Sequence, residues 1–216
     1  MCRTAPEFAS PALAVALAAA DERWLRHQLG TLLPAQLAEW RGSTDLGGMF
    51  ELQTDAQAGK AEHYDELAEQ LAALLSGETD PIANAANTSA LLFQLVPDLN
   101  WAGFYFMKDG GLVLGPFQGK PACVRIPVGS GVCGTAVARM QSVLVDDVHA
   151  FPGHIACDAG SRSELVVPLI RGGAPIGVLD LDSPRLARFD PVDQAGIERV
   201  ARLYLEASTD GRIGAV

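Results

Sequence analysis

Apolar residues recur at helical spacing in the segment that runs from Ala61 to Leu75. They stand three or four positions apart, which predicts an amphipathic helix with one buried stripe. The stripe consists of Tyr64, Leu67, Leu71 and Leu74. Asp80 then offers an N-cap and Pro81 a first helical residue, so we predict a second helix that ends before Pro97.

Short apolar runs separated by turn residues replace the helical pattern after Leu99, and they predict strands. The expected strands cover residues 100–107, 112–117, 123–128, 143–145, 165–170 and 174–181. Two further helices are expected at 129–140 and, with Asp190 as N-cap, at 191–205. Strands in series with helices at both ends indicate an α+β fold, in which a central antiparallel sheet has helices packed mainly on one face.

Composition and charge narrow the class of protein. Of the 216 residues 49% are hydrophobic, enough for a buried core, and the formal net charge is −10 with scattered basic residues. This balance argues against nucleic acid or an anionic membrane as partner. No apolar run approaches the roughly 18 residues of a membrane span. The apolar stretch from Phe8 to Ala20 lacks the basic start of an export signal, so we predict a cytoplasmic protein.

The first 48 residues differ from the rest of the chain. They are rich in Ala and Leu, show weak helical patterning and end in a Gly-containing loop, whereas the segment from Met49 runs smoothly into the first strong helix. We therefore expect an N-terminal extension at 1–48, irregular or helical, and a single domain at 49–216.

Cysteines provide the first chemical signal. Cys157 lies with His149 and His154 in a predicted loop of about 18 residues, and loops of that length are commonly functional. Cys123 lies near a strand start and Cys133 near a helix start, where the helix amides are expected to lower the pKa of its thiol. The spacings lack the close pairs of a zinc site, so no metal is expected. Alternatively, Cys123 and Cys133 are simply buried and only Cys157 is reactive.

Carboxylates provide a second signal. Asp180 and Asp182 alternate with leucines on one predicted strand, so both point to the face that also carries Ile176 and Val178. Glu164 begins the neighbouring strand, and a hairpin would bring it near Asp180 or Asp182. Three converging acids would bind an ammonium group or include one general acid of raised pKa. The alternative is a solvated strand end.

Aromatic residues provide a third signal. Trp101 and Tyr105 lie four positions apart on the first predicted strand and therefore share a face, and Gly103 between them leaves space. Such a pair forms a suitable wall for a small or cationic ligand, although it is also compatible with ordinary core packing.

These stretches together resemble one family, the free methionine-(R)-sulfoxide reductases, a catalytic branch of the GAF superfamily. The resemblance covers roughly Met49 to Leu205. It rests on Asn100-Trp-Ala-Gly-Phe-Tyr105, Leu114-Gly-Pro-Phe-Gln-Gly-Lys-Pro-Ala-Cys123, Gly131-Val-Cys-Gly-Thr135, Asp147-Val-His-Ala-Phe-Pro-Gly-His-Ile-Ala-Cys-Asp158, Ser161-Arg-Ser-Glu164 and Gly177-Val-Leu-Asp-Leu-Asp-Ser-Pro184. Because Met49 resembles a family N-terminus, the resemblance also raises the expectation that residues 1–48 are a mispredicted start.

The resemblance implies a thiol mechanism without a bound cofactor. Cys157 matches the nucleophile, which attacks the sulfoxide sulfur and becomes a sulfenic acid. Cys123 matches the usual resolving partner and Cys133 a third thiol that can also take part, and which of them resolves first stays open. A thioredoxin-type protein, supplied by NADPH, would reduce the resulting disulfide.

The resemblance also assigns the pocket. Glu164, Asp180 and Asp182 match acids that bind the free amino acid, with Glu164 and Asp182 also counted as catalytic through protonation of the sulfoxide oxygen. Trp101 and Tyr105 match the aromatic wall. A homodimer is implied as well. The competing interpretations are a GAF domain that senses a small molecule or redox state without turnover, and a structural zinc protein.

Overall fold

The computed structural model describes residues 59–153 and 160–209. Its elements are α4 (Lys60–Leu74), α5 (Pro81–Leu95), β1 (Trp101–Lys108), β2 (Gly111–Gly119), β3 (Arg125–Pro127), α6 (Gly131–Arg139), β4 (Val143–Val145), the 3-10 turn η2 (Val148–Ala150), β5 (Ser163–Arg171), β6 (Ala174–Ser183) and α7 (Pro191–Ala207). The predicted boundary between residues 48 and 49 lies outside the described residues and stays a prediction.

The six strands form one antiparallel sheet in the order β3-β2-β1-β6-β5-β4. The β5–β6 hairpin is the longest pairing and runs from Ser163 opposite Ser183 to Arg171 opposite Ala174. β1 and β6 occupy the centre, so residues that are far apart in sequence become neighbours there. The predicted antiparallel sheet is confirmed.

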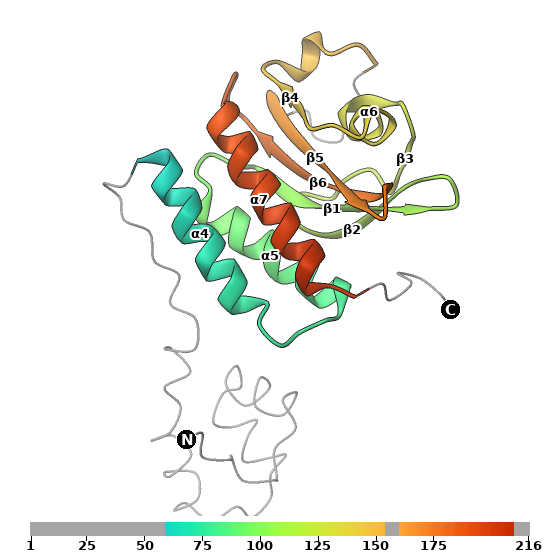
Figure 1. Ribbon diagram of the computed structural model, residues 1–216. Coiled ribbons are helices and arrows are strands. Elements are labelled where there is room, and N and C mark those ends of the chain that lie inside the picture. Colours follow the sequence, from blue (N-terminus) through green and yellow to red (C-terminus); the bar gives the residue numbers. More distant parts are fainter. Residues whose placement is uncertain (1–58, 154–159, 210–216) are drawn as a thin grey trace, which may run out of the picture. The chain divides into compact units, whose positions relative to one another are not determined.

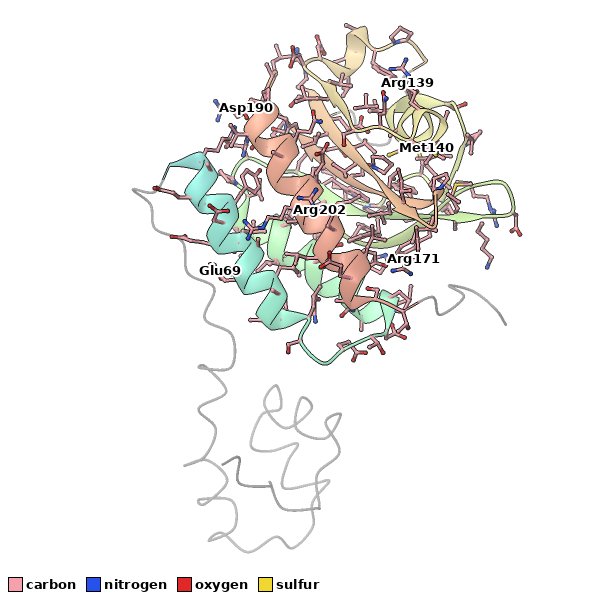
Figure 2. The ribbon with its side chains drawn as sticks, in the orientation of Figure 1. Glu69, Arg139, Met140, Arg171, Asp190 and Arg202 are labelled. Atoms are coloured by element: carbon pink, nitrogen blue, oxygen red, sulfur yellow. The ribbon has the colours of Figure 1, made fainter. Side chains whose placement is uncertain are left out.

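Three helices cover one face of the sheet. α5 and α7 pack against the sheet there and α4 packs beside them, mainly on α7, whereas α6 lies against the opposite face (Figure 1). The larger core fills the three-helix side and contains fully buried side chains such as Phe104, Leu165 and Leu179. Charged residues such as Glu69 of α4 and Arg202 of α7 are exposed (Figure 2). The predicted packing of helices mainly on one face is confirmed.

A smaller core lies between the other face of the sheet and α6. Trp101 and Tyr105 of β1, Val178 of β6, and Val132 and Cys133 of α6 belong to it. The alternation of β1 and β6 sends neighbouring residues to opposite faces, so the same strands build both cores. Trp101, Tyr105 and Cys133, three of the residues predicted to carry chemistry, therefore lie on the α6 side.

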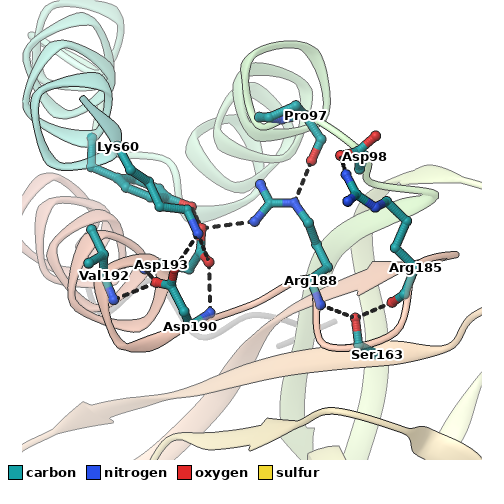
Figure 3. A network of polar contacts seen from close by, with 10 residues as sticks. Lys60, Pro97, Asp98, Ser163, Arg185, Arg188, Asp190, Val192 and Asp193 are labelled. Atoms are coloured by element: carbon teal, nitrogen blue, oxygen red, sulfur yellow. Dashed lines mark hydrogen bonds and ion pairs between the residues drawn. The ribbon is translucent and has the colours of Figure 1, made fainter. Parts of the chain in front are cut away.

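A buried carboxylate joins α4 to α7 on the three-helix side (Figure 3). The side chain of Asp193 is fully buried and accepts hydrogen bonds from the Tyr64 hydroxyl at 2.8 Å and from Lys60 Nζ at 2.5 Å. Arg188 donates to the same carboxylate at 3.1 Å. Because the charge is paired on several sides, its burial is tolerated, and α4 is fixed to the N-terminal turn of α7.

The same network reaches the first residue of β5. The backbone N–H of Arg188 donates to Ser163 Oγ at 3.3 Å, and Ser163 Oγ donates to the carbonyl of Arg185 at 2.7 Å (Figure 3). Arg188 Nε also donates to the Pro97 carbonyl, just after α5. The connection between β6 and α7 therefore holds the end of β5 that carries Glu164.

Several expected boundaries changed in the structure. The strand expected at 123–128 shortens to three residues, whereas the β5–β6 hairpin is longer at its open end than expected. The loop after β4 is not wholly irregular, because the Asp147 side chain accepts from the His149 N–H and starts the η2 turn. Ile176 packs against the three-helix core rather than beside Val178, since the β5–β6 register shifts between Leu169 and Ile170. Within the described ranges, no helix is long and apolar enough to cross a membrane.

Candidate active site

A cavity opens between the sheet and the start of α6, and it brings six of the predicted site residues together. The cavity holds about 550 Å³ of space, part of it open to solvent. The predicted residues that line it are Trp101, Tyr105, Cys133, Glu164, Asp180 and Asp182. They come from β1, β5, β6 and α6, so the sheet supplies most of the floor and the helix supplies one wall.

Strand register explains why the acids and the aromatic residues meet. Across the three adjacent strands, one row consists of Trp101 opposite Asp182 and Asp182 opposite Glu164. In the next row on the same face, Gly103 lies opposite Asp180. Because glycine has no side chain, Asp180 has no bulky neighbour on β1, whereas Val166 lies opposite it on β5. Glu164 was predicted to lie near Asp180 or Asp182, and the strand pairing places it opposite Asp182.

The aromatic wall is a stack of three rings. The Trp101 and Tyr105 ring centroids lie 5.8 Å apart, and Phe117 also stacks on Trp101, with centroids 5.3 Å apart. Trp101 Nε1 donates to the Lys120 carbonyl at 3.1 Å, which fixes the indole orientation. A Cβ added at Gly103 would overlap both Phe117 and Trp101, so the glycine is needed for this stack.

Two of the acids are deeply buried. Glu164 and Asp180 are each 6% exposed, so the alternative of a solvated strand end is wrong for them. Burial, followed by the charges of Asp180 and Asp182, raises the pKa of Glu164 well above its usual value. Burial raises the pKa of Asp180 to about 7, and hydrogen bonds with Cys133 and Glu164 partly oppose that rise. The pair therefore retains a proton near neutral pH.

Cys133 faces these acids from the third residue of α6. Its Sγ lies 3.3 Å from Asp180 Oδ2 and 3.9 Å from Glu164 Oε1, and the residue is 4% exposed. Burial, together with the charges of Asp180 and Glu164, raises the pKa of the Cys133 thiol well above its usual value. The expected lowering of this pKa by the helix amides is wrong, because desolvation and two nearby acids outweigh the helix dipole.

One oxygen of this cluster has no hydrogen-bond partner within the part of the chain that the structure describes. It is Asp180 Oδ1, which is buried. Buried polar atoms are nearly always hydrogen-bonded, so an unpaired carboxylate oxygen beside a cavity favours a ligand that brings its own donors. An organic ammonium group has three such donors.

A metal ion is the other candidate ligand for this cluster. Ligand atoms of Cys133, Glu164 and Asp180 lie within 4.8 Å of one another, close enough to contact one cation. Metal ligands must lose their protons, however, and all three groups have raised pKa values. As it stands, the arrangement suits protons and an ammonium group better than a metal ion.

The sequence interpretation missed two polar parts of the cavity. Ser161 is 3% exposed, lines the cavity and accepts a hydrogen bond from Asn100 Nδ2 at 3.0 Å. Gly131 and Val132 bring the N-terminus of α6 to the cavity, and Ser130 makes no side-chain cap there. The first amides of a helix lack intrahelical acceptors and favour an anion. The glycine-rich start of the helix was the available signal.

The remaining predicted residues either lie outside the described residues or are absent from the cavity lining. Cys123 is bound in a disulfide whose other cysteine lies outside the described residues. Cys157 and His154 also lie outside the described residues. His149 is exposed in the η2 turn and does not line the cavity.

Comparisons with known proteins support one family. A family model described as GAF domain matches residues 87–207. The free methionine-R-sulfoxide reductase of Escherichia coli (strain K12) is 57% identical over 153 residues, which cover 70% of this chain and 93% of that protein. The Saccharomyces cerevisiae enzyme of the same name is 41% identical over 152 residues, 67% of this chain and 84% of that protein.

A solved structure is similar to this chain in both sequence and fold. The X-ray structure of free methionine-R-sulfoxide reductase from Neisseria meningitidis, in complex with its substrate, superposes with a TM-score of 0.71. The two sequences are 45% identical, and the match covers 74% of this chain and 95% of that one.

Proposed function

This chain belongs to the GAF-domain family and, within it, to the free methionine-R-sulfoxide reductases. We propose that it reduces free methionine-(R)-sulfoxide through a cycle of cysteine oxidation and reduction at the cavity beside α6. The observation that carries the proposal is the buried Glu164–Asp180 pair facing the Trp101 wall. This combination offers a proton, a negative charge and an apolar surface within one small space.

The cavity is complementary to a free amino acid. The substrate ammonium would pair with Asp180 and Asp182, and the carboxylate would lie at the uncapped N-terminus of α6. The methyl sulfoxide end would lie against Trp101. A methionine sulfoxide within a polypeptide has neither a free ammonium nor a free carboxylate, so it would leave the acids and the helix amides unpaired. This would make the enzyme selective for the free amino acid.

The reduction requires a proton and a nucleophile. Glu164 retains a proton because its pKa is raised, and we assign it the protonation of the sulfoxide oxygen, with Asp182 opposite it in the strand pairing. The Cys157 thiolate attacks the sulfur and takes the oxygen, and the S–O bond to the substrate breaks. Free methionine leaves, and Cys157 becomes a sulfenic acid.

A second thiol then closes the cycle. Cys123 condenses with the sulfenic acid of Cys157, so that a disulfide forms and one water leaves. The disulfide-bonded state of Cys123 supports its role as this resolving thiol. A thioredoxin-type dithiol reduces the disulfide by exchange, supplying two electrons and two protons that originate from NADPH. We place this reaction in the cytoplasm, where such reductants operate, and in a homodimer as the family resemblance implies.

The deciding experiment measures loss of free methionine-(R)-sulfoxide with thioredoxin, thioredoxin reductase and NADPH. We expect turnover of the R but not the S epimer by wild type, abolished in Cys157→Ser and retained in the matched control Cys2→Ser. Cys123→Ser should complete about one turnover and then stall with thioredoxin.

Two results would contradict the proposal. Undiminished turnover by Cys157→Ser would remove the nucleophile assignment. Binding of the sulfoxide by reduced wild type without any turnover would favour the sensing GAF domain instead.

A further inference from the structure

We infer that Cys133 is a positioning residue, whose thiol donates a hydrogen bond to Asp180 and holds that carboxylate in place for the substrate ammonium. The inference rests on the proposed function for the identity of the substrate. It gives Cys133 a role that differs from the redox role of the other two cysteines in the domain.

Two carboxylate oxygens lie within hydrogen-bond distance of the Cys133 thiol, and one of them is clearly closer. Its Sγ is closer to Asp180 Oδ2, at 3.3 Å, than to Glu164 Oε1, at 3.9 Å. The first distance is that of an S–H···O hydrogen bond, and the thiol is free and buried. With Oδ2 engaged by the thiol, Oδ1 is the oxygen that remains for a ligand, and it is the atom without a partner among the described residues.

The surroundings favour a thiol over a thiolate at this position. The titratable groups that line the cavity with Cys133 are Glu164 of β5, Asp180 and Asp182 of β6, Tyr105 of β1 and Lys120. Three of these are carboxyl groups, and burial adds to their effect by raising the pKa of the thiol. Condensation with a sulfenic acid proceeds through a thiolate, so Cys133 is poorly placed to resolve Cys157 and well placed to donate.

Loss of this donor has a defined consequence. A hydrogen bond to Asp180 favours its charged form, and the thiol opposes the rise in the pKa of Asp180 that burial causes. Without the thiol, Asp180 should take up a proton at a pH about one unit higher than in wild type. At pH 7 the substrate ammonium would then meet a neutral acid.

The test compares Cys133→Ser, which keeps a donor, with Cys133→Ala and Cys133→Val, which remove it. Cys133→Val leaves no cavity at this position, so it covers the case in which the alanine variant does not fold. KM and kcat are measured from pH 6 to 9, with Val137→Ala as a control for repacking of α6 (Val137 is buried in the same core but does not line the cavity).

We expect the KM of the donor-free variants to be about fivefold above wild type at pH 7, in proportion to the loss of ionised Asp180, and to approach wild type near pH 9. Their kcat should change less, and Cys133→Ser and Val137→Ala should keep the wild-type pH profile. A Cys133→Ser variant as impaired as Cys133→Val, or a raised KM that does not recover with pH, would overturn the inference. So would a donor-free variant that stalls after one turnover, because Cys133 would then be a resolving thiol.

A second readout separates this inference from the proposed function. Infrared titration of the buried carboxyl groups in the reduced, substrate-free protein needs no turnover. The midpoint near pH 7 should move up in Cys133→Val and stay in place in Cys133→Ser. An unmoved midpoint in Cys133→Val refutes the inference even if wild type is active. If the midpoint moves in Cys133→Val but wild type shows no turnover, only the proposed function is refuted.

Discussion

Replacing Asp180 by asparagine removes a charge that the fold holds out of water. Asp180 is 6% exposed, and its Oδ1 has no partner in the described parts of the chain. Burial raises its pKa from 3.8 to about 7. Since one pKa unit corresponds to about 1.4 kcal/mol, the ionised carboxylate lowers the free energy of unfolding by about 4 kcal/mol.

Proton linkage determines at which pH the Asp180→Asn substitution stabilises the protein. Below pH 3.8 the carboxyl group is protonated in both the folded and the unfolded state, so its burial carries no ionisation penalty. The penalty grows between pH 3.8 and about 7 and is complete above pH 7. Asp180→Asn should therefore be about 2 to 4 kcal/mol more stable than wild type at pH 8.5, after allowance for the new amide, and nearly equal at pH 4.

Urea unfolding of the reduced proteins at the two pH values measures this difference. Asp190→Asn is a matched control, because hydrogen bonding by Lys60 lowers the pKa of Asp190 and its loss should destabilise the protein at neutral pH instead. The same substitution should weaken substrate binding, so we expect the KM of Asp180→Asn to increase by about tenfold or more. Equal or lower stability of Asp180→Asn at pH 8.5 would show that the residue carries no desolvated charge.

Two further substitutions test the packing around the site. Gly103→Ala should displace the Trp101 ring, raise KM several-fold and lower the free energy of unfolding by about 1 to 3 kcal/mol. At Gly59 an added Cβ would meet only Glu62 Oε2, at 3.7 Å, so Gly59→Ala should leave KM unchanged and lower the free energy of unfolding by less. Unchanged kinetics of Gly103→Ala would refute the role of the stack. Tyr64→Phe removes the hydroxyl that donates to buried Asp193 and should lower the free energy of unfolding by about 1.5 kcal/mol in thermal or urea unfolding, with KM unchanged. A loss below about 0.5 kcal/mol would mean that Lys60 and Arg188 suffice to stabilise Asp193.

Periodicity predicted the parts of the site that lie along single strands or across one hairpin. The shared face of Asp180 and Asp182 follows from alternation, and the approach of Glu164 follows from the turn at Arg171-Gly-Gly173. The shared face of Trp101 and Tyr105 follows in the same way. Their position opposite the acids also required the pairing of β1 with β6, which the sequence pattern alone does not determine.

Features that depend on contacts between distant elements escaped prediction. The pKa of the Cys133 thiol is raised because α6 lies over β5 and β6. The sequence argument considered only the start of the helix, and it therefore predicted a lowered pKa. The position of Ile176 depends on a register shift that no single residue marks. The pairing of Asp193 with Lys60 spans 133 positions, and charge spacing gives no sign of it.

The sheet separates two cores, and this division bears on how such a protein evolves. The larger core, with α4, α5 and α7, supplies most of the cooperative stability, while the ligand contacts gather around the short helix α6 on the other side. Substitutions around α6 can reshape what is bound without weakening the scaffold behind the sheet, which is how one architecture can host many activities. In native-state hydrogen exchange, the amides of α6 should accordingly exchange before those of α5 and α7.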